Sequence, residues 1–193
     1  MKKSSSQNNK KLISVGIDVG SSNGAIAIID EDLNILTACK VPIYQTEIKS
    51  KRNTSKLNKQ TGKYEKDYKK RSWVDFKELG KIFEPFIPAP LVLTIERVLV
   101  KPGEGEPSSF AFGNAMGIFQ GLYPYLDPLA YYEPLAKDWK KEMGVTSDKD
   151  TSIKLALELY EVDLKKFVKR GKVDDIAEAL LLAFYGLKKL YNK

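Results

Sequence analysis

Three apolar runs joined by two short turns constrain the fold of this chain more than any other feature. Residues 12–20 (LISVGIDVG), 24–30 (GAIAIID) and 35–43 (ILTACKVPI) each have the length and residue types of a buried strand. Connections this short join antiparallel neighbours, because a parallel crossover needs a dozen or more residues. The sequence therefore predicts an antiparallel meander at the start of the fold.

The rest of the chain alternates helical and extended patterns. Apolar spacing predicts a helix over 74–86, a buried strand over 91–98 and a loop at 101–107. We then expect a helix, a strand and three more helices, with Asp174 as the N-cap of the last, at 108–123, 129–134, 136–143, 148–160 and 173–191. This order predicts an α/β fold with a mixed five-stranded sheet, in which the meander is joined by parallel strands and helices flank it.

The absence of histidine restricts the chemistry, and there is one cysteine, Cys39. These two facts exclude Ser-His-Asp and Cys-His nucleophile systems, histidine-base nucleases, zinc sites and a disulfide framework. A reducing compartment is expected. A bound metal must be held by carboxylate oxygens, which favours Mg²⁺ or Mn²⁺.

Positive charge is concentrated in two segments. The first eleven residues carry +4, and residues 49–71 hold ten Lys or Arg against two acids, so with a net charge of +7 the rest of the chain carries −5. A basic stretch of this kind attracts a phosphate backbone, although a solubilising loop has the same composition. The cations expected to contact phosphates are Lys51, Arg52, Lys69, Lys70 and Arg71.

Aromatic residues are interspersed with these cations, so bases could stack there while phosphates are bound. The aromatic residues are Tyr44, Tyr64, Tyr68 and Trp73. Residues 44–72 are expected to form either a β-hairpin or an arm that orders on DNA.

A single domain is predicted over residues 12–193, with a basic insertion at about 44–72 and a disordered basic tail at 1–11. No run of eighteen apolar residues is present, so no membrane span is expected. The first apolar run is too short for a signal peptide. We therefore expect a cytoplasmic or nucleoid-associated protein, with viral or organellar origin left open.

Four acids stand where acids are costly or closely spaced. Asp18 ends an apolar run and Glu96 lies within another, where an isolated carboxylate costs several kcal/mol unless it is paired, protonated or metal-bound. Asp175 and Glu178 are spaced i, i+3 on the last helix and share a face. If the first and fourth strands are neighbours and the last helix packs on them, the four acids converge. Two divalent ions there could activate a water and stabilise the leaving oxygen of a phosphodiester.

Each acid also has a purely structural interpretation. Asp18 could form a D-x-G-S turn, and Glu96 could pair with Arg97 or with a lysine. Asp174, Asp175 and Glu178 could be first-turn acids that complement the helix dipole. The joint pattern favours a site.

The motifs resemble those of the RuvC family of Holliday junction resolvases, which have an RNase H-like fold, and especially its phage and organellar members. They occur in family order over about 170 residues: GIDVGSSNGAIAII (16–29), LTIERV (93–98), PGEGEPSS with FAFGNAMGIFQG (102–121), DWKKEMGV (138–145) and DDIAEALLLA (174–183). The first motif alone is weak, because sugar kinases and actin-like ATPases open with a similar turn. The ordered set is specific.

The resemblance implies roles for individual residues. The metal-binding and catalytic acids are Asp18, Glu96, Asp175 and Glu178, the last replacing a common Asp, so the choice among Asp174, Asp175 and Glu178 stays open. Lys140 and Lys149 match basic positions near the scissile strand, with Lys149 also assigned to catalysis, and Leu99 matches a segment that enters the junction centre. Both lysines and Leu99 could also be ordinary surface or packing residues. Gly113, Gly117 and Gly121 match a helix near the dimer interface or DNA, or allow close packing on the sheet.

The expected function is Mg²⁺- or Mn²⁺-dependent cleavage of four-way DNA junctions by a homodimer with two metal ions per site, leaving 5′-phosphate and 3′-hydroxyl ends. A sugar kinase or actin-like ATPase would need roughly twice this length and a second phosphate loop. A nuclease for flaps or forks and a non-catalytic DNA-binding protein remain as alternatives.

Overall fold

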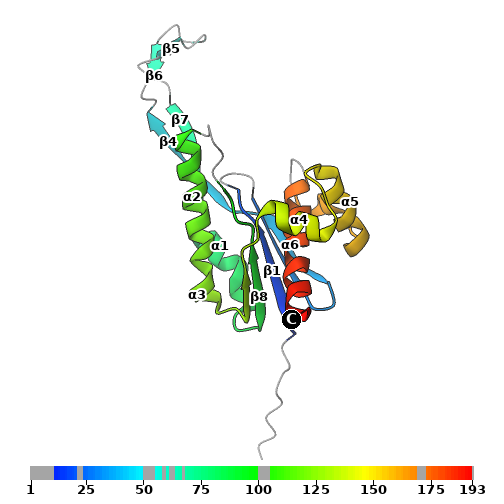
Figure 1. The fold of residues 1–193 in the computed structure, drawn as a ribbon. Coiled ribbons are helices and arrows are strands. Elements are labelled where there is room, and N and C mark those ends of the chain that lie inside the picture. Colours follow the sequence, from blue (N-terminus) through cyan, green and yellow to red (C-terminus); the bar gives the residue numbers. More distant parts are fainter. Residues whose placement is uncertain are drawn as a thin grey trace, which may run out of the picture.

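A mixed five-stranded sheet forms the centre of the fold (Figure 1). The structure is a computed structural model that describes residues 11–20, 24–49, 55–57, 60, 64–66, 68–99, 105–168 and 173–192 of the chain. The sheet order is β3-β2-β1-β8-β9. Its strands are β1 (Ile13–Asp18), β2 (Ala25–Asp30), β3 (Ile35–Lys40), β8 (Leu91–Ile95) and β9 (Ala130–Tyr132).

The pairing confirms the predicted fold class. β1 and β3 both pair antiparallel with β2, whereas β8 pairs parallel with β1 and β9 parallel with β8. Two predicted strands are too long. The third ends at Lys40, because the chain leaves the sheet there to form a separate hairpin, and β8 ends at Ile95. Glu96 was predicted inside a strand and instead follows its end.

Strand alternation assigns side chains to two faces of the sheet. Ile13, Val15 and Ile17 of β1 enter one apolar core, and Leu91, Leu93 and Ile95 of β8 enter the same core. The intervening residues, Ser14 and Gly16 on β1, lie against the last helix. The period of two therefore directs Asp18 and Glu96 toward that second face.

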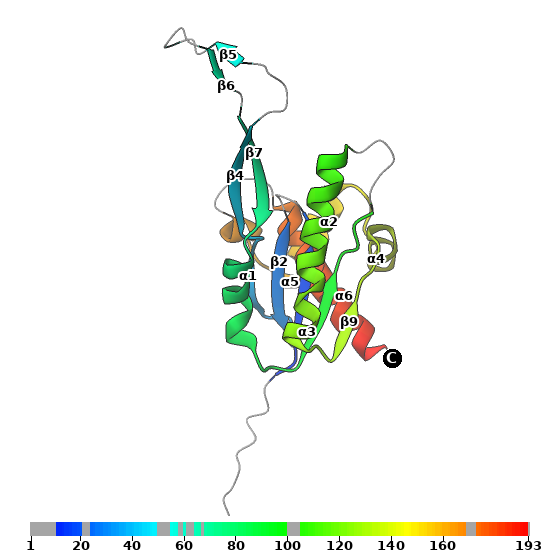
Figure 2. The same ribbon diagram turned by 90° about the vertical axis from the view of Figure 1, so that its left-hand side faces the viewer.

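Helices cover both faces (Figures 1 and 2). The first core also contains Leu79, Phe83, Phe119 and Leu122, from three helices on one side. Those helices are α1 (Phe76–Phe83), α2 (Glu106–Gln120) and α3 (Leu122–Leu126), with the 3-10 turn η1 (Glu84–Phe86) after α1. On the other side lie α4 (Ala136–Met143), α5 (Lys149–Tyr160), η2 (Leu164–Phe167) and α6 (Asp174–Tyr191). No helix among the described residues is long and apolar enough to span a membrane.

Close backbone approach fixes α6 on β1 and β8. A Cβ on Gly16 would lie 2.1 Å from the Ala179 carbonyl oxygen and 2.3 Å from the Ala183 amide nitrogen. A Cβ on Gly186 would lie 2.4 Å from Oγ1 of Thr94 on β8. Ser14 Oγ also donates a 2.7 Å hydrogen bond to the Ala183 carbonyl. Glycine is required at Gly16, because any side chain there would push α6 off the sheet.

The basic segment begins and ends as a β-hairpin. β4 (Ile43–Lys49) pairs antiparallel with β7 (Tyr68–Val74), and Figure 2 shows this pair extending away from the sheet. Two short strands, β5 (Ser55–Leu57) and β6 (Tyr64–Lys66), pair at the far end. We call the β4–β7 pair the arm. Of the two forms considered for residues 44–72, the described part has the hairpin form.

Two helical expectations need correction. The helix predicted at 108–123 is divided into α2 and α3, and its glycines do not pack on the sheet: a Cβ on Gly113 or Gly117 would meet nothing within 4 Å. Asp174 is not an N-cap, because Val173 holds that position and the Asp174 side chain bonds Lys149 instead. Helix α1 is capped by Asp75, whose side chain accepts from the amides of Lys77 and Glu78.

Candidate active site

Asp18 and Glu96 meet at the carboxyl edge of two parallel strands. In the β1–β8 register Ile17 pairs with Ile95, and the Glu96 amide donates a 2.9 Å hydrogen bond to the Ile17 carbonyl. The next residue of each strand is an acid on the α6 face. Parallel pairing thus brings together two carboxylates that are far apart in sequence.

Helix α6 supplies the other acids. The residues that touch β1 and β8 are Ala179, Ala183 and Gly186, and Glu178 lies one position before this contact line. Carboxylate oxygens of Asp18, Glu96 and Glu178 all lie within 4.8 Å of one another. Three elements therefore present acids to one point, and we call these three residues the acidic triad.

Asp175 lies beside the triad and carries its own counter-ion. Its carboxylate is bonded by the ammonium group of Lys40, and Lys149 Nζ lies 3.9 Å from its other oxygen. Lys149 also bonds Asp174, whose side chain is 3% exposed. Among the side chains that the structure describes, Asp174 Oδ1 is buried without a hydrogen-bond partner. The two adjacent acids thus differ: Asp175 faces the triad side, and Asp174 is buried against Lys149.

Helix α4 completes the surroundings of the triad. The indole nitrogen of fully buried Trp139 donates a 2.7 Å hydrogen bond to Glu96 Oε2. The next residue, Lys140, donates a 2.6 Å hydrogen bond to Glu178 Oε1. The hydroxyl of Ser152 on α5 lies 3.5 Å from the same oxygen. Arg97, considered as the partner of Glu96, instead pairs with Glu133 at 3.4 Å.

The electrostatics of the triad are unfavourable without a cation. Burial raises the pKa of Asp18 well above its ordinary value, and the carboxylates of Glu96, Glu178 and Asp175 raise it further. Burial also raises the pKa of Glu96, against the opposing hydrogen bond from Trp139. Burial alone would raise the pKa of Asp174, but the hydrogen bond and charge of Lys149 outweigh it, and the pKa is lowered.

These residues fit a divalent cation. The donors are carboxylate oxygens only, the set that Mg²⁺ and Mn²⁺ prefer. Three ammonium groups, those of Lys40, Lys140 and Lys149, already bond Asp175, Glu178 and Asp174, which shows that this edge of the sheet attracts cations. The residues that would hold an ion are Asp18, Glu96, Glu178 and Asp175.

The remaining predicted DNA contacts lie elsewhere. Leu99 is 61% exposed beyond the end of β8, which leaves it accessible to a partner. Lys70 and Arg71 are exposed on the arm. Lys69 lies in β7 opposite Ile48, but its side chain is outside the described residues, as are Lys51 and Arg52.

Sequence reasoning missed Lys40 and the hydrogen bond from Trp139. The Lys40 position could have been found from strand register: Lys40 pairs with Ala25, and Ala25 pairs with Asp18. Directly paired residues share a face, so Lys40 lies in one row with Asp18, separated by a small alanine. The Trp139 contact had no such signal, because it depends on where α4 packs.

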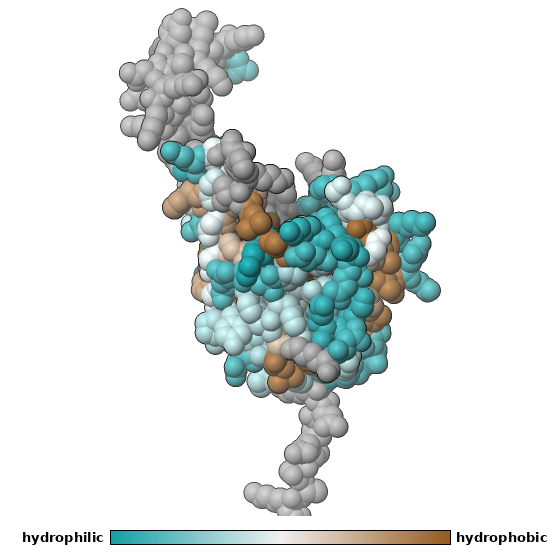
Figure 3. Space-filling view, viewed as in Figure 1, coloured by the Kyte–Doolittle hydropathy of each residue, from teal (hydrophilic) through white to brown (hydrophobic). Residues whose placement is uncertain are grey.

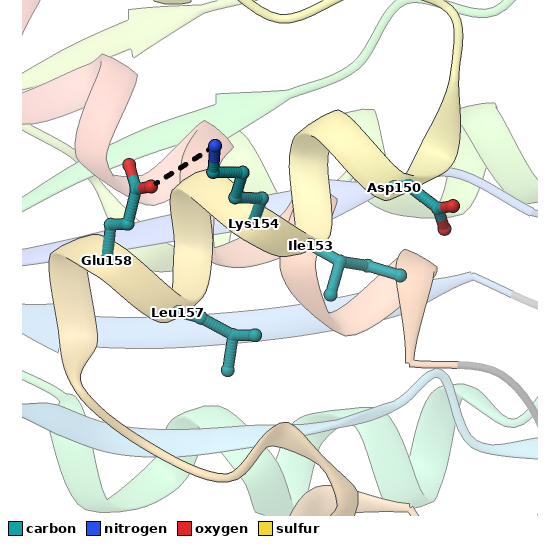
Figure 4. Close-up of a pocket in the computed structure, with 5 residues that line it drawn as sticks. All are labelled: Asp150, Ile153, Lys154, Leu157 and Glu158. Atoms are coloured by element: carbon teal, nitrogen blue, oxygen red, sulfur yellow. Dashed lines mark ion pairs between the residues drawn. The ribbon is translucent and has the colours of Figure 1, made fainter.

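A surface hollow lies along α5. Its lining residues are Asp150, Ile153, Lys154, Leu157 and Glu158. Figure 4 shows the side chains of Ile153 and Leu157 directed to the same side of the helix, and the 3.9 Å ion pair between Lys154 and Glu158. None of the acids described above lines it.

The strand order and the flanking helices match those of solved structures with an RNase H-like fold. No protein-family model matches the chain, and no curated protein matches its sequence. Solved structures do match. Thermus thermophilus RuvC in complex with a Holliday junction substrate is 13% identical over 90% of this chain and 91% of its own, with a TM-score of 0.52.

Two further structures agree with this assignment. Thermus thermophilus RuvC has 11% identity over 93% of this chain and 96% of its own, with a TM-score of 0.50. The yeast mitochondrial Holliday junction resolvase Ydc2 has 16% identity over 93% of this chain and 78% of its own, also with a TM-score of 0.50. At these identities the likeness establishes the fold.

Proposed function

We propose that this protein is a structure-specific endodeoxyribonuclease that resolves four-way DNA junctions. The observation that carries the proposal is the convergence of Asp18, Glu96 and Glu178 to within 4.8 Å at the carboxyl edge of β1 and β8. A partly buried acidic triad on this fold suits metal-dependent hydrolysis of a phosphodiester, which needs no histidine. The RuvC match is to a complex with a Holliday junction substrate.

Each residue has a defined part in this proposal. Asp18, Glu96 and Glu178 would hold Mg²⁺ or Mn²⁺, with Asp175 beside them as a further ligand and two ions per site expected. When bound, such ions supply a water nucleophile at neutral pH and neutralise the charge on the leaving oxygen. Lys140 and Lys149, which bond Glu178 and Asp174, are the cations beside the site that would contact the scissile phosphate. The products carry 5′-phosphate and 3′-hydroxyl ends.

We infer that the working form is a homodimer. Residues 107–126, which cover most of α2 and all of α3, contain no charged residue in a chain that is 30% charged. Gly113 and Gly117 on this stretch are exposed, with room for another backbone. A two-fold axis through such a face places two sites in opposite directions, as cleavage of two like strands requires.

The proposed substrate also implies a location. A junction-resolving enzyme acts where DNA is, so we place it in the cytoplasm or nucleoid of a reducing compartment, in agreement with the single Cys39. A viral or an organellar setting satisfies the same conditions.

The test is a synthetic mobile junction with each strand labelled in turn, assayed with fork, flap and duplex controls. We expect Mg²⁺-dependent paired nicks on opposing strands of the junction and products that ligase seals. Nicks on one strand alone, or equal activity on flaps and forks, would favour the alternative of a related branch nuclease. No cleavage of any substrate, with binding intact, would leave a non-catalytic DNA-binding protein.

A further inference from the structure

An aromatic groove lies at the foot of the arm, separate from the acidic triad. It has a volume of about 680 Å³, and the arm, the start of α1 and α2 all contribute to its walls. Figure 3 shows apolar surface gathered below the arm. Its aromatic lining residues are Tyr44, Trp73, Phe76 and Phe110.

Local structure holds these rings in place. Tyr44 and Trp73 are direct cross-strand partners on β4 and β7, so they share one face of the arm. The Trp73 indole nitrogen donates a 2.9 Å hydrogen bond to Thr46 Oγ1. Phe110 of α2 meets Trp73 edge to face, with ring centroids 6.2 Å apart. The groove is therefore preformed.

The rings are nevertheless open to solvent. Phe76 and Phe110 are each 62% exposed, and Tyr44 is 50% exposed. Several large aromatic side chains exposed around one hollow are uncommon on a protein surface unless a partner covers them. Their faces offer stacking surface.

The charge beside the groove favours one kind of partner. Lys77 lines the groove, and Lys70 and Arg71 are exposed on the same strand as Trp73. The one acid in the lining, Asp75, has its carboxylate engaged by the first turn of α1. Residues 49–71, which run from the end of β4 into β7, carry +8 in sequence. A second copy of the chain seated here would bring its own basic segment, whereas a nucleic acid would neutralise the charge.

We propose that the groove binds unpaired nucleobases of DNA by stacking. Rings on three elements receive the bases while neighbouring cations bind the phosphates, the combination used for single strands. This inference deepens the proposed function, since the centre of a four-way junction is a source of unstacked bases. It adds Phe76 and Phe110 to the proposed DNA-binding surface and places a base-stacking site where the arm joins the rest of the fold.

The experiment measures metal-free binding in EDTA, so that it is independent of cleavage. The probes are a fluorescent oligothymidylate, the same oligomer with abasic sites in place of the bases, and a duplex of equal length. The variant is Phe76→Ala with Phe110→Ala, both exposed, and the control is Tyr191→Ala, which is 61% exposed at the end of α6 outside the groove.

We expect the double variant to bind oligothymidylate about tenfold more weakly, as loss of one stacked base predicts. Its affinities for the abasic oligomer and the duplex should stay within twofold of the unaltered protein, and the salt slope should not change. Oligothymidylate should also quench the fluorescence of Trp73, and Trp73→Phe should remove that change, because the other tryptophan, Trp139, is buried.

Unchanged oligothymidylate affinity, or an equal loss on the abasic oligomer, would overturn the proposal. A change of oligomeric state in sedimentation with binding retained would assign the groove to a second copy instead. If the unaltered protein stacks bases but cuts no junction, the groove stands and the proposed function fails. If the unaltered protein cuts junctions and the double variant binds oligothymidylate normally, the proposed function stands and the groove proposal fails.

Discussion

The acidic triad and the arm are opposite in charge and are built in opposite ways. The triad gathers residues that are far apart in sequence, and each is fixed by the sheet or by α6 packed on it. The arm is one local hairpin that extends away from the sheet, and its described cations, Lys70 and Arg71, are exposed. We infer that chemistry is located where positions are fixed by the core, and that affinity is supplied where they are not. The predictions below test this division.

Neutralising one triad acid should have the largest effect. Asp18→Asn or Glu96→Gln should lower junction nicking by about 1,000-fold or more, because a metal ligand is removed. Asp175→Asn and Glu178→Gln should follow, while junction affinity holds or rises. Asp150→Asn, an exposed acid on α5, is the matched control and should cleave normally. Normal nicking by Asp18→Asn would contradict the assignment of Asp18 as a metal ligand needed for cleavage.

Separating α6 from the sheet should strongly destabilise the protein. Gly16→Ala places a methyl group 2.1 Å from the Ala179 carbonyl oxygen, so we expect a loss of more than about 3 kcal/mol in unfolding free energy. Gly113→Ala is the control: nothing lies within 4 Å, and a helical alanine should be neutral or add about 0.5–1 kcal/mol. Urea unfolding followed by circular dichroism measures both. A native-like Gly16→Ala protein would show that α6 does not fix the site.

Neutralising the arm should weaken binding without changing stability. Replacing Lys51, Arg52, Lys69, Lys70 and Arg71 with glutamine should lower the log–log salt slope by about 1 for each phosphate that is no longer neutralised. The melting temperature should stay constant, because the described members, Lys70 and Arg71, are exposed. Fluorescence anisotropy over a salt series is the measurement. An unaltered salt slope would indicate that the basic segment does not contact phosphates and serves only as a solubilising loop.

The smallest expected effect is on the pH dependence of stability. The pKa of Asp18 is raised above its ordinary 3.8, so its folded form prefers the proton, and metal-free stability falls as pH rises through the folded pKa. Asp174, whose pKa is lowered, contributes stability that is lost as pH falls through its folded pKa, and Asp18→Asn leaves this intact. Metal-free Asp18→Asn should therefore melt higher at pH 7, by about 2–4 °C per kcal/mol of relieved repulsion.

That difference has two internal checks. It should close as pH falls toward 4, where the unaltered Asp18 is protonated. It should reverse when Mg²⁺ is added at pH 7, because binding stabilises only the protein that holds the ion. Scanning calorimetry at several pH values follows both. If the metal-free unaltered protein melts higher than Asp18→Asn at pH 7, the Asp18 carboxylate is not destabilised by burial and by the neighbouring acids.

The strand meander and the acids of the candidate site were both predictable from the sequence, but from different signals. The meander followed from short turns, and the positions of Asp18 and Glu96 from the cost of acids in apolar strands. The extents of two strands were predicted too long: β3 ends at Lys40, where the chain leaves the sheet for the arm, and β8 ends at Ile95. Asp174 was misplaced as a cap, because its buried carboxylate bonds the ammonium group of Lys149 instead of the backbone amides of the first turn. Contacts such as Trp139 with Glu96 depend on helix packing, which periodicity does not encode.

Direct metal binding tests the central claim, that Asp18 at the end of β1, Glu96 just after β8 and Glu178 on α6 form a cation site. Electron paramagnetic resonance of free Mn²⁺, titrated with DNA-free protein, counts the bound ions. We predict saturable binding by the unaltered protein, loss of that binding in Asp18→Asn and Glu96→Gln, and full binding in the Asp150→Asn control. Equal Mn²⁺ binding by the unaltered protein and Asp18→Asn, or none by either, would contradict the account.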